Sequence, residues 1–377
     1  MRKILFGFLV FLAIVGGTIR YFFGGGERLE DRTTAPLIDF AKAEVVADLD
    51  LPPGNVAVSR TGRVFFTFHP EGRPPVQLAE LVDGKPVPYP NVAFQKKRED
   101  GLYFQSVLSL RIDRQDRLWA LDYANYATGQ PRLIAFDIEH GDVVHSYDFP
   151  SEIAPLLSML NDLQVDPEGR RIYIADTSIF GQKQAIIVYD VERKNARRVL
   201  EGHHSVVPKR YIMNAAGRDM VFFGIFTLTI GVDSIALDRQ GEWLYFAPVS
   251  DDKLYRIRAS ALADESLSSE AVEAQVETFA DKTLSDGSST DDDGNVYLTD
   301  MEHSAILTVG QDRKLRTLLK DARLRWPDGL SFGPDGWLYV SCSALHEVIL
   351  KSAGNVRSKA PYQIFRFRPG AGAIPGH

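Results

Sequence analysis

The stretch LNDLQVDPEGRRIYIADT, residues 160–177, decides the fold. It alternates apolar and polar residues as a half-buried strand does, turns at Pro167 and Gly169, and then alternates again. The same outline of strand, polar turn and aromatic-rich strand occurs five more times: GNVAVSRTGRVFFTF from Gly54, LSLRIDRQDRLWALD from Leu108, DSIALDRQGEWLYFAP from Asp233, DGSSTDDDGNVYLTD from Asp286 and DGLSFGPDGWLYVSC from Asp328. The chain therefore contains six copies of one structural unit.

Each unit continues into further strands. RLIAFDI, AIIVYDV, KLYRIRA, AILTVG and EVILKS are predicted third strands, and VVHSYDF and LRTLLK are predicted fourth strands. Successive units start 54, 53, 72, 53 and 42 residues apart, and a unit of about 40–50 residues with four strands is typical of a propeller blade. We therefore predict an all-β fold, a six-bladed β-propeller over residues 43–377. Residues 43–52 should supply the outer strand of the last blade, and the 72-residue step indicates an insertion around residues 197–226.

An apolar segment precedes the repeats. Residues 4–19 carry no charge, Arg2 and Lys3 precede them, and Arg20 and three aromatic residues follow. This pattern is typical of a signal peptide or a membrane anchor in residues 1–23, with the basic end in the cytoplasm and the rest exported. We favour an uncleaved anchor helix, followed by a linker over residues 24–42. The predicted location is periplasmic or extracellular, with a tether to the inner membrane if the segment is kept.

Charge and cysteine content narrow the range of partners. The chain has 50 acidic and 43 basic residues, and no basic run is long enough to follow a phosphate backbone, which argues against nucleic acid. Cys342 is the single cysteine, so no intrachain disulfide can form. We expect a monomer whose partner is a small molecule and which meets a membrane only through its N-terminal segment.

The repeat also predicts where a site would lie. In a propeller, the inner strand of each blade starts beside the central channel, so the residues in front of the six inner strands face the channel mouth. In chain order these are Gly54, Leu108, Asn161, Asp233, Asp286 and Asp328, with Asn55 and Asp162 directly behind two of them. Any one Asp or Asn there is explained by a turn, but three acids and an amide around one axis favour a bound cation.

Carboxylate and amide oxygens suit Ca²⁺ or another divalent cation, and an organic cation is the alternative. We predict Asn161, Asp233, Asp286 and Asp328 as the cation ligands, with Asp162 as a further ligand contact.

Three histidines are predicted on the same face of the propeller. His303 and His346 follow second strands, and His204 lies in the insertion. His303 is a candidate proton acceptor, and His204 and His346 are candidate ligand contacts. The alternative for each is a solvated loop residue.

Several landmarks, in this order, resemble the major royal jelly protein / yellow family from about residue 45 to about residue 345: DRLWALD, PRLIAFDI, LNDLQVD, GEWLYFAPVSDDKLYRI and RWPDGLSFGPDGWLYV. The resemblance implies a six-bladed propeller. Members of the family include carriers that hold small molecules in the channel, and some insect members are associated with dopachrome conversion. This sequence lacks the disulfide cysteines of the insect members. Asp233, where they usually carry an apolar residue, is closer to the related gluconolactonase-like propellers, which hold a divalent cation.

Three functions follow from these patterns. The first is an exported binding protein that holds a small cationic or aromatic molecule at the acidic mouth. The second is a Ca²⁺-type lactonase or esterase, in which the ion polarises a carbonyl and Asp233, Asp286 or His303 takes a proton from water. The third, a dopachrome-type isomerase, is implied by the resemblance alone.

Overall fold

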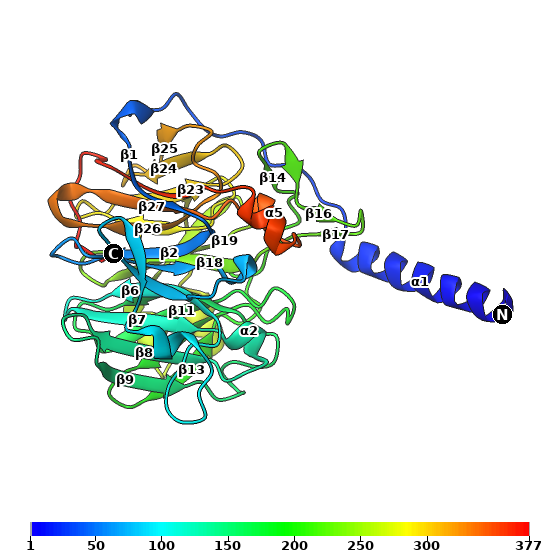
Figure 1. The fold of residues 1–377 in the computed structure, drawn as a ribbon, viewed down its shortest axis with the longest axis horizontal. Coiled ribbons are helices and arrows are strands. Elements are labelled where there is room, and N and C mark those ends of the chain that lie inside the picture. Colours follow the sequence, from blue (N-terminus) through cyan, green and yellow to red (C-terminus); the bar gives the residue numbers. More distant parts are fainter. Residues whose placement is uncertain (1, 377) are drawn as a thin grey trace.

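The computed structural model describes residues 2–376, and their strands form six four-stranded antiparallel sheets arranged as a ring (Figure 1). The fold is a six-bladed β-propeller, which confirms the prediction from the repeats. The inner strand of each blade contacts the inner strands of the two neighbouring blades around a central channel. Helix α1 (Arg2–Phe23) projects from one face of this ring.

The first three blades follow the predicted units in order, each sheet running from its inner to its outer strand. Blade 1 contains β2 (Pro53–Val58), β3 (Val64–Phe68), β4 (Leu78–Val82) and β5 (Lys85–Pro88); blade 2 contains β6 (Val107–Ile112), β7 (Arg117–Asp122), β8 (Arg132–Asp137) and β9 (Val143–Asp148); blade 3 contains β10 (Leu160–Val165), β11 (Arg171–Asp176), β12 (Ala185–Asp190) and β13 (Asn195–Val199).

Blades 4 to 6 repeat this arrangement. Blade 4 contains β18 (Val232–Leu237), β19 (Trp243–Pro248), β20 (Lys253–Arg258) and β21 (Glu277–Asp281); blade 5 contains β22 (Ser288–Thr290), β23 (Val296–Asp300), β24 (Ala305–Val309) and β25 (Leu315–Lys320); blade 6 contains β26 (Pro327–Phe332), β27 (Leu338–Cys342), β28 (Tyr362–Phe367) and β1 (Glu44–Leu49). The short helices between strands are α2 (Ala124–Ala127), α3 (Ala259–Ala263), α4 (Ser269–Glu273) and α5 (Ala353–Arg357), with 3₁₀ turns η1 (Phe40–Lys42), η2 (Pro70–Gly72), η3 (Val92–Gln95), η4 (Pro334–Gly336) and η5 (Leu345–Glu347).

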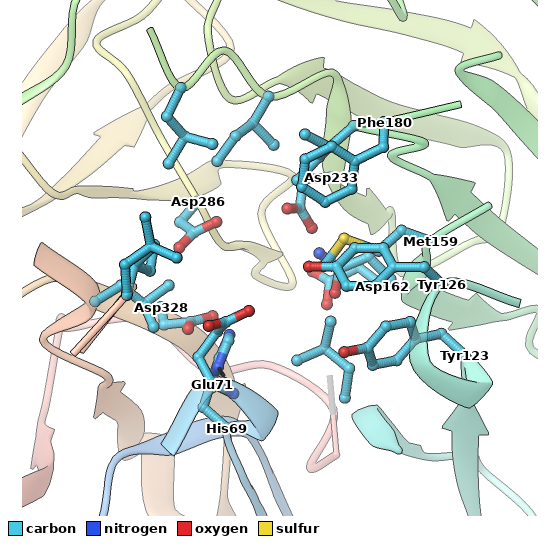
Figure 2. Close-up of a pocket in the computed structure, with 18 of the residues that line it drawn as sticks. His69, Glu71, Tyr123, Tyr126, Met159, Asp162, Phe180, Asp233, Asp286 and Asp328 are labelled. Carbon is cyan, nitrogen blue, oxygen red and sulfur yellow. Dashed lines mark hydrogen bonds between the residues drawn. The ribbon is translucent and has the colours of Figure 1, made fainter. Parts of the chain in front are cut away.

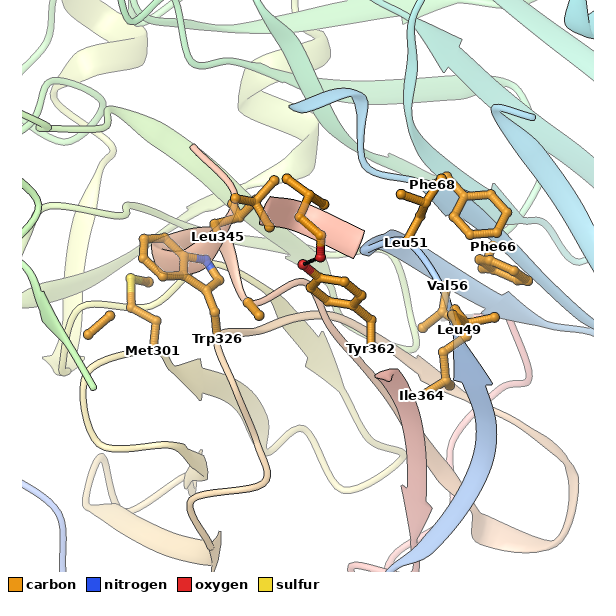
Figure 3. Packing of buried hydrophobic residues seen from close by; sticks show 14 of the residues in the cluster. Leu49, Leu51, Val56, Phe66, Phe68, Met301, Trp326, Leu345, Tyr362 and Ile364 are labelled. Atoms are coloured by element: carbon orange, nitrogen blue, oxygen red, sulfur yellow. Dashed lines mark hydrogen bonds between the residues drawn. The ribbon is translucent and has the colours of Figure 1, made fainter. Parts of the chain in front are cut away.

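Blade 6 closes the ring with the predicted strand from the N-terminal side. Strand β1 pairs antiparallel with β28, with Leu49 opposite Tyr362. Leu49 and Ile364 belong to the same buried cluster as Val56 of blade 1, so the seam between the last and first blades is apolar (Figure 3). Because β1 occupies the outer edge of blade 6, the two ends of the propeller sequence are held together.

An aspartate fixes the turn between the inner and second strands in four blades. The Asp113 carboxylate accepts hydrogen bonds from the backbone N–H groups of Gln115 and Arg117, both at 2.9 Å. Asp291 does the same for the N–H groups of Asp293 and Asn295, and Asp166 and Asp238 accept from the chain four residues on. These bonds satisfy the tight turn and explain why the repeat carries an acid there.

One predicted strand is wrong. The segment EVILKS does not form the third strand of blade 6, which is β28 instead. Residues 345–351 form η5 and turns, with Leu350 at a positive φ of 59°. Their apolar side chains are explained by other contacts, since Val348 is buried in the core cluster and Leu350 lies at the cavity described below.

The predicted insertion crosses the mouth face as two small hairpins. Strand β14 (Asn214–Ala215) pairs with β15 (Arg218–Asp219), and β16 (Val221–Phe222) pairs with β17 (Phe226–Thr227). Lys209 Nζ lies 2.8 Å from the Asp251 carboxylate in blade 4, and Glu302 of blade 5 accepts a hydrogen bond from the Asn214 N–H at 2.7 Å. The insertion is thus fixed to two blades beside the channel.

Residues 24–42 run along the propeller between α1 and β1. Glu27 pairs with Tyr211 in the insertion, Arg32 donates to the Asp252 and Lys282 carbonyls, and the Leu37 and Ile38 N–H groups donate to carbonyls of β25. These bonds hold the segment that joins α1 to the first strand.

Candidate functional site

A cavity of about 310 Å³ lies at the mouth of the channel, and the polar residues predicted from the repeat line it. These are Asn161 and Asp162 of β10, Asp233 of β18, Asp286 just before β22, and Asp328 of β26, together with Asn55 of β2. The acids come from four different blades and surround the floor of the cavity (Figure 2). Repeat geometry therefore brings together side chains that are far apart in the sequence.

The walls above this acidic floor are largely apolar. They come from loops of several blades and from the insertion: Leu108, Tyr123, Tyr126, Met159, Ile179, Phe180, Phe222, Phe223, Phe226, Leu228, Ile230, Leu345, Ile349 and Leu350. Tyr123 and Tyr126 contact each other edge to face, and Tyr126 contacts Phe180 in the same way. The cavity therefore offers aromatic contacts above and carboxylates below, which suits a molecule with an apolar body and a polar head.

The protein itself provides hydrogen-bond donors to the acids, as Asp162 and Asp286 show. Asp162 Oδ1 accepts hydrogen bonds from Asn55 Nδ2 at 2.7 Å and from Ser109 Oγ at 3.2 Å. Asp286 Oδ2 accepts a hydrogen bond from Trp326 Nε1 at 2.6 Å. These hydrogen bonds fix the two carboxylates in position and stabilise their ionised forms.

Arg111 of β6 lies in the channel next to Asp162. Its side chain is buried, and its Nη1 and Nε donate to the carbonyls of Leu330 at 3.0 Å and Leu163 at 3.4 Å. The guanidinium thus links blades 2, 3 and 6 and places one positive charge near Asp162, whose pKa it lowers. Lys282, which is also buried, lowers the pKa of Asp286 in the same way, so two cations face four acids and carboxylates remain in excess.

Burial raises the pKa values of all four acids. The pKa of Asp162 rises to about 6, chiefly through burial and against the effect of Arg111, and the pKa of Asp286 also rises to about 6 through burial. Burial raises the pKa values of Asp233 and Asp328 well above the ordinary range, and repulsion from neighbouring acids adds to the shift. A cation bound among them would offset that repulsion, so the site is electrostatically prepared for positive charge.

These shifts predict a decline in stability with rising pH. A carboxyl whose pKa is raised by folding contributes stability that is complete below the unfolded-state pKa of about 4. That contribution is lost as the pH rises through the folded-state pKa, about 6 for Asp162. We expect these acids to lower the free energy of unfolding of the full chain in EDTA, measured by urea unfolding, by about 3 kcal/mol between pH 5 and pH 8. The buried His69, whose pKa is lowered to about 4, acts in the opposite direction and offsets part of this loss.

The substitution Asp233→Asn tests whether the cavity causes this pH dependence. Because it removes one of the repelling groups, the variant should show a smaller decrease in stability between pH 5 and pH 8. An equal change in stability between pH 5 and pH 8 in the variant and in the unsubstituted chain would contradict the prediction.

The structure does not bring the three predicted histidines to this cavity. His303 hydrogen-bonds through Nδ1 to Asp300 at 2.9 Å and lies against residues 24–42. His204 contacts the rings of His203 and Tyr255 in blade 4. His346 is nearer, because its ring stacks on Trp326, the donor to Asp286, but it faces a separate hollow.

A different histidine lines the cavity and was missed. His69 follows β3 directly and is buried, and its Nδ1 accepts a hydrogen bond from the Glu71 N–H at 3.2 Å. Burial lowers its pKa to about 4, so the ring is neutral at pH 7 and carries its proton on Nε2. Figure 2 shows His69 and Glu71 beside Asp328. The signal was present in the sequence, since His69 occupies the same loop position as His303 and His346.

Carboxylates are suitable ligands for a cation, but in this cavity they lie too far apart to bind a single metal ion together. Oxygen ligands are those that Ca²⁺ prefers. Over residues 2–376, however, no three His, Cys, Asp or Glu side chains lie close enough together to hold one metal ion. Asp162 and Asp286 also keep their hydrogen bonds to the protein. This arrangement fits a molecular cation better than a bare ion, and we derive no step through a metal.

The sequence is similar to that of a known protein family and of several insect proteins. A sequence model of the family described as major royal jelly protein matches residues 105–351. Major royal jelly protein 3 of Apis mellifera is 24% identical over 61% of this chain and 42% of its own length. The yellow-related salivary protein M10 of Phlebotomus duboscqi is 27% identical over 44% of this chain and 45% of its own length. The chain thus matches less than half of the length of these relatives.

Solved structures with the same fold cover nearly the whole chain. A calcium-binding protein, regucalcin, from Agrobacterium tumefaciens aligns with 91% of this chain and 98% of its own at a TM-score of 0.56 and 15% identity. A gluconolactonase from Xanthomonas campestris aligns with 86% of this chain and 88% of its own at a TM-score of 0.54 and 12% identity. At such identities the likeness is one of fold.

Proposed function

This chain belongs to the major royal jelly protein family, and from that premise we propose that it is a binding protein for a small amphipathic cation. The observation that carries the proposal is the cavity, with buried carboxylates at its floor and aromatic and aliphatic side chains above them. An ammonium group would lie among Asp233, Asp286 and Asp328, and an apolar or aromatic body would contact Tyr126, Phe180 and Phe226. A volume of about 310 Å³ suits a ligand of a few rings or a short chain.

Two of the acids would make the main contacts with the cation. Asp162 and Asp286 accept hydrogen bonds from Asn55 and Trp326, whereas burial, with repulsion from neighbouring acids added, raises the pKa values of Asp233 and Asp328 the most. A bound ammonium would hold both in the ionised form and would form charge-assisted hydrogen bonds to them. Binding therefore releases protons from the site.

The proposed location is outside the cytoplasm. Helix α1 is apolar over Phe6–Phe23, and none of the described side chains in that stretch is buried. With Arg2 and Lys3 on the cytoplasmic side, the propeller would be exported and held at the membrane by α1.

Ligand binding is tested with an aromatic amine and its matched acid. We expect tryptamine to raise the melting temperature of the purified full chain and to bind in calorimetry. Indole-3-acetate, which has the same ring and a carboxylate in place of the amine, should do neither, because the floor would repel it. Equal shifts with the two ligands, or none with either, would contradict the proposal.

A second candidate is a divalent-cation-dependent hydrolase of lactones or esters. The oxygen-rich floor favours it, and two proteins of the same fold are described as calcium-binding and as a gluconolactonase. In this case Ca²⁺, and not tryptamine, would raise the melting temperature, EDTA would reverse the shift, and a lactone would be consumed. We do not propose dopachrome-type isomerisation, because it rests on the family resemblance alone.

A further inference from the structure

Helix α1 is fixed to the rim of the cavity. The ring of Phe23, its last residue, lies 6.0 Å from the ring of Phe226, which lines the cavity. Arg20 Nη1 donates to the Gly224 carbonyl at 2.6 Å, and Arg210 Nη2 donates to the Phe22 carbonyl at 2.9 Å. Figure 1 shows the C-terminal end of α1 beside β16 and β17, with the N-terminus pointing away from the propeller. The apolar helix and the cavity mouth are therefore on the same face of the propeller.

Large apolar side chains are exposed at this rim. Phe223, Phe180 and Leu350 line the cavity yet are 86%, 51% and 61% exposed, and they come from three separate segments. Leu156 and Leu157 are also exposed, and the Leu157 N–H donates to the carbonyl of the cavity residue Tyr126. Phe223 has a positive φ of 53°, which is rare for a bulky residue. Packing within the propeller does not explain why the Phe223 side chain is exposed at the tip of the β16–β17 hairpin.

A lipid bilayer fits this surface. Phe6–Phe23 is 18 residues, or about 27 Å of helix, against about 30 Å of hydrocarbon in a bilayer. The single charge in it, Arg20, is near the end that contacts the propeller. Since Phe23 touches the rim directly, a membrane-spanning α1 would place Phe223 and Leu350 at the lipid surface. Arg20 and Arg210, at the contact between α1 and the propeller, would lie near lipid phosphates.

We propose that the mouth of the cavity rests on the outer surface of the membrane that α1 spans, and that the ligand enters from the lipid as a membrane-partitioned amphiphilic amine. Its chain would pass between Phe180, Phe223 and Leu350, and its ammonium group would reach the acids. The ligand class rests on the proposed function, whereas the contact with the membrane does not.

The contact is tested with single fluorescent labels on the full chain in vesicles of phosphatidylcholine and phosphatidylglycerol. Phe223→Cys and Leu350→Cys each provide a site for the environment-sensitive dye NBD, and the native Cys342 is 2% exposed and should not react. The control is Glu168→Cys, an exposed position in the turn at the far end of β10 from Asn161. We expect blue-shifted emission and strong quenching by spin-labelled acyl chains at 223 and 350, and neither at 168.

Three outcomes separate the proposals. Labels at 223 and 350 that behave like the control at 168 would overturn the membrane contact, even if tryptamine binds. Shielding that disappears when the protein is diluted within the vesicles would also overturn it, because a second copy would then cover the rim. Lipid-exposed labels without binding of tryptamine, or of dodecylamine supplied in the vesicles, would overturn the ligand class and the proposed function and leave the membrane contact standing.

Discussion

The double substitution Asp233→Asn/Asp328→Asn is expected to weaken tryptamine binding at least about 100-fold at pH 8. Each acid would form a charge-assisted hydrogen bond to the ammonium group, and the loss of one such bond costs about 1.5–3 kcal/mol, with a factor of ten for every 1.4 kcal/mol. Asparagine has nearly the same shape, so the cavity should keep its form. Calorimetric titration of the two proteins measures the change.

The same substitution should raise the melting temperature of the ligand-free chain at pH 8. Both acids are buried, and repulsion from other acids adds to the increase in their pKa values. Neutral amides remove that repulsion. A structural defect would lower both the affinity for tryptamine and the melting temperature. We expect instead a lower affinity and a higher melting temperature. Glu168→Gln, at an exposed turn far from the cavity, should change neither. If the double variant binds tryptamine with unchanged affinity, Asp233 and Asp328 do not contact the ligand.

The fold could be predicted from the repeated unit because the unit specifies both the alternation of apolar and polar residues along each strand and the distance between successive blades. Alternation and turn residues identify the inner and second strands of all six blades, and Asp113, Asp166, Asp238 and Asp291 show why the turns carry an acid. The segment EVILKS was misassigned because an apolar run fits a buried turn as well as a strand. In the structure, Val348 fills the core without joining a sheet.

The polar floor could be predicted for the same reason. Asn161, Asp233 and Asp328 have equivalent places in their blades, so the symmetry of the fold brings them together. Loops do not share that symmetry. His69, His303 and His346 all follow second strands, yet only the first of these three lines the cavity, because each loop takes its own path.

Apart from Leu108, the walls could not be predicted, because their residues belong to loops and to an insertion that do not follow the repeat. Phe222, Phe226 and Leu228 come from the insertion, whose position depends on contacts such as Glu302 with the Asn214 N–H. These are pairings between distant parts of the chain that no local pattern encodes. Arg111 was missed for another reason, since an arginine in a strand usually faces solvent.

Arg111→Met is expected to lower the free energy of unfolding by about 3–5 kcal/mol, the usual cost of leaving a buried charge without its partner. The guanidinium is 1% exposed, bonds to the Leu163 and Leu330 carbonyls, and lowers the pKa of Asp162. Methionine fills a similar volume but supplies neither the charge nor the donors. Urea unfolding at pH 8 measures the loss.

The companion substitution Asp162→Asn distinguishes a charge effect from poor packing. In the Arg111→Met/Asp162→Asn double variant no buried carboxylate is left facing an apolar side chain, so part of the lost stability should return, with a coupling of about 1–3 kcal/mol. If the two substitutions caused only packing defects, their effects on the free energy of unfolding would be additive. The surface variant Arg316→Met, which removes an exposed pair with Asp312, should leave the free energy of unfolding nearly unchanged. If Arg111 acts as this comparison requires, its charge stabilises the ionised form of Asp162, so the propeller can keep that buried acid at the cavity without a bound ligand.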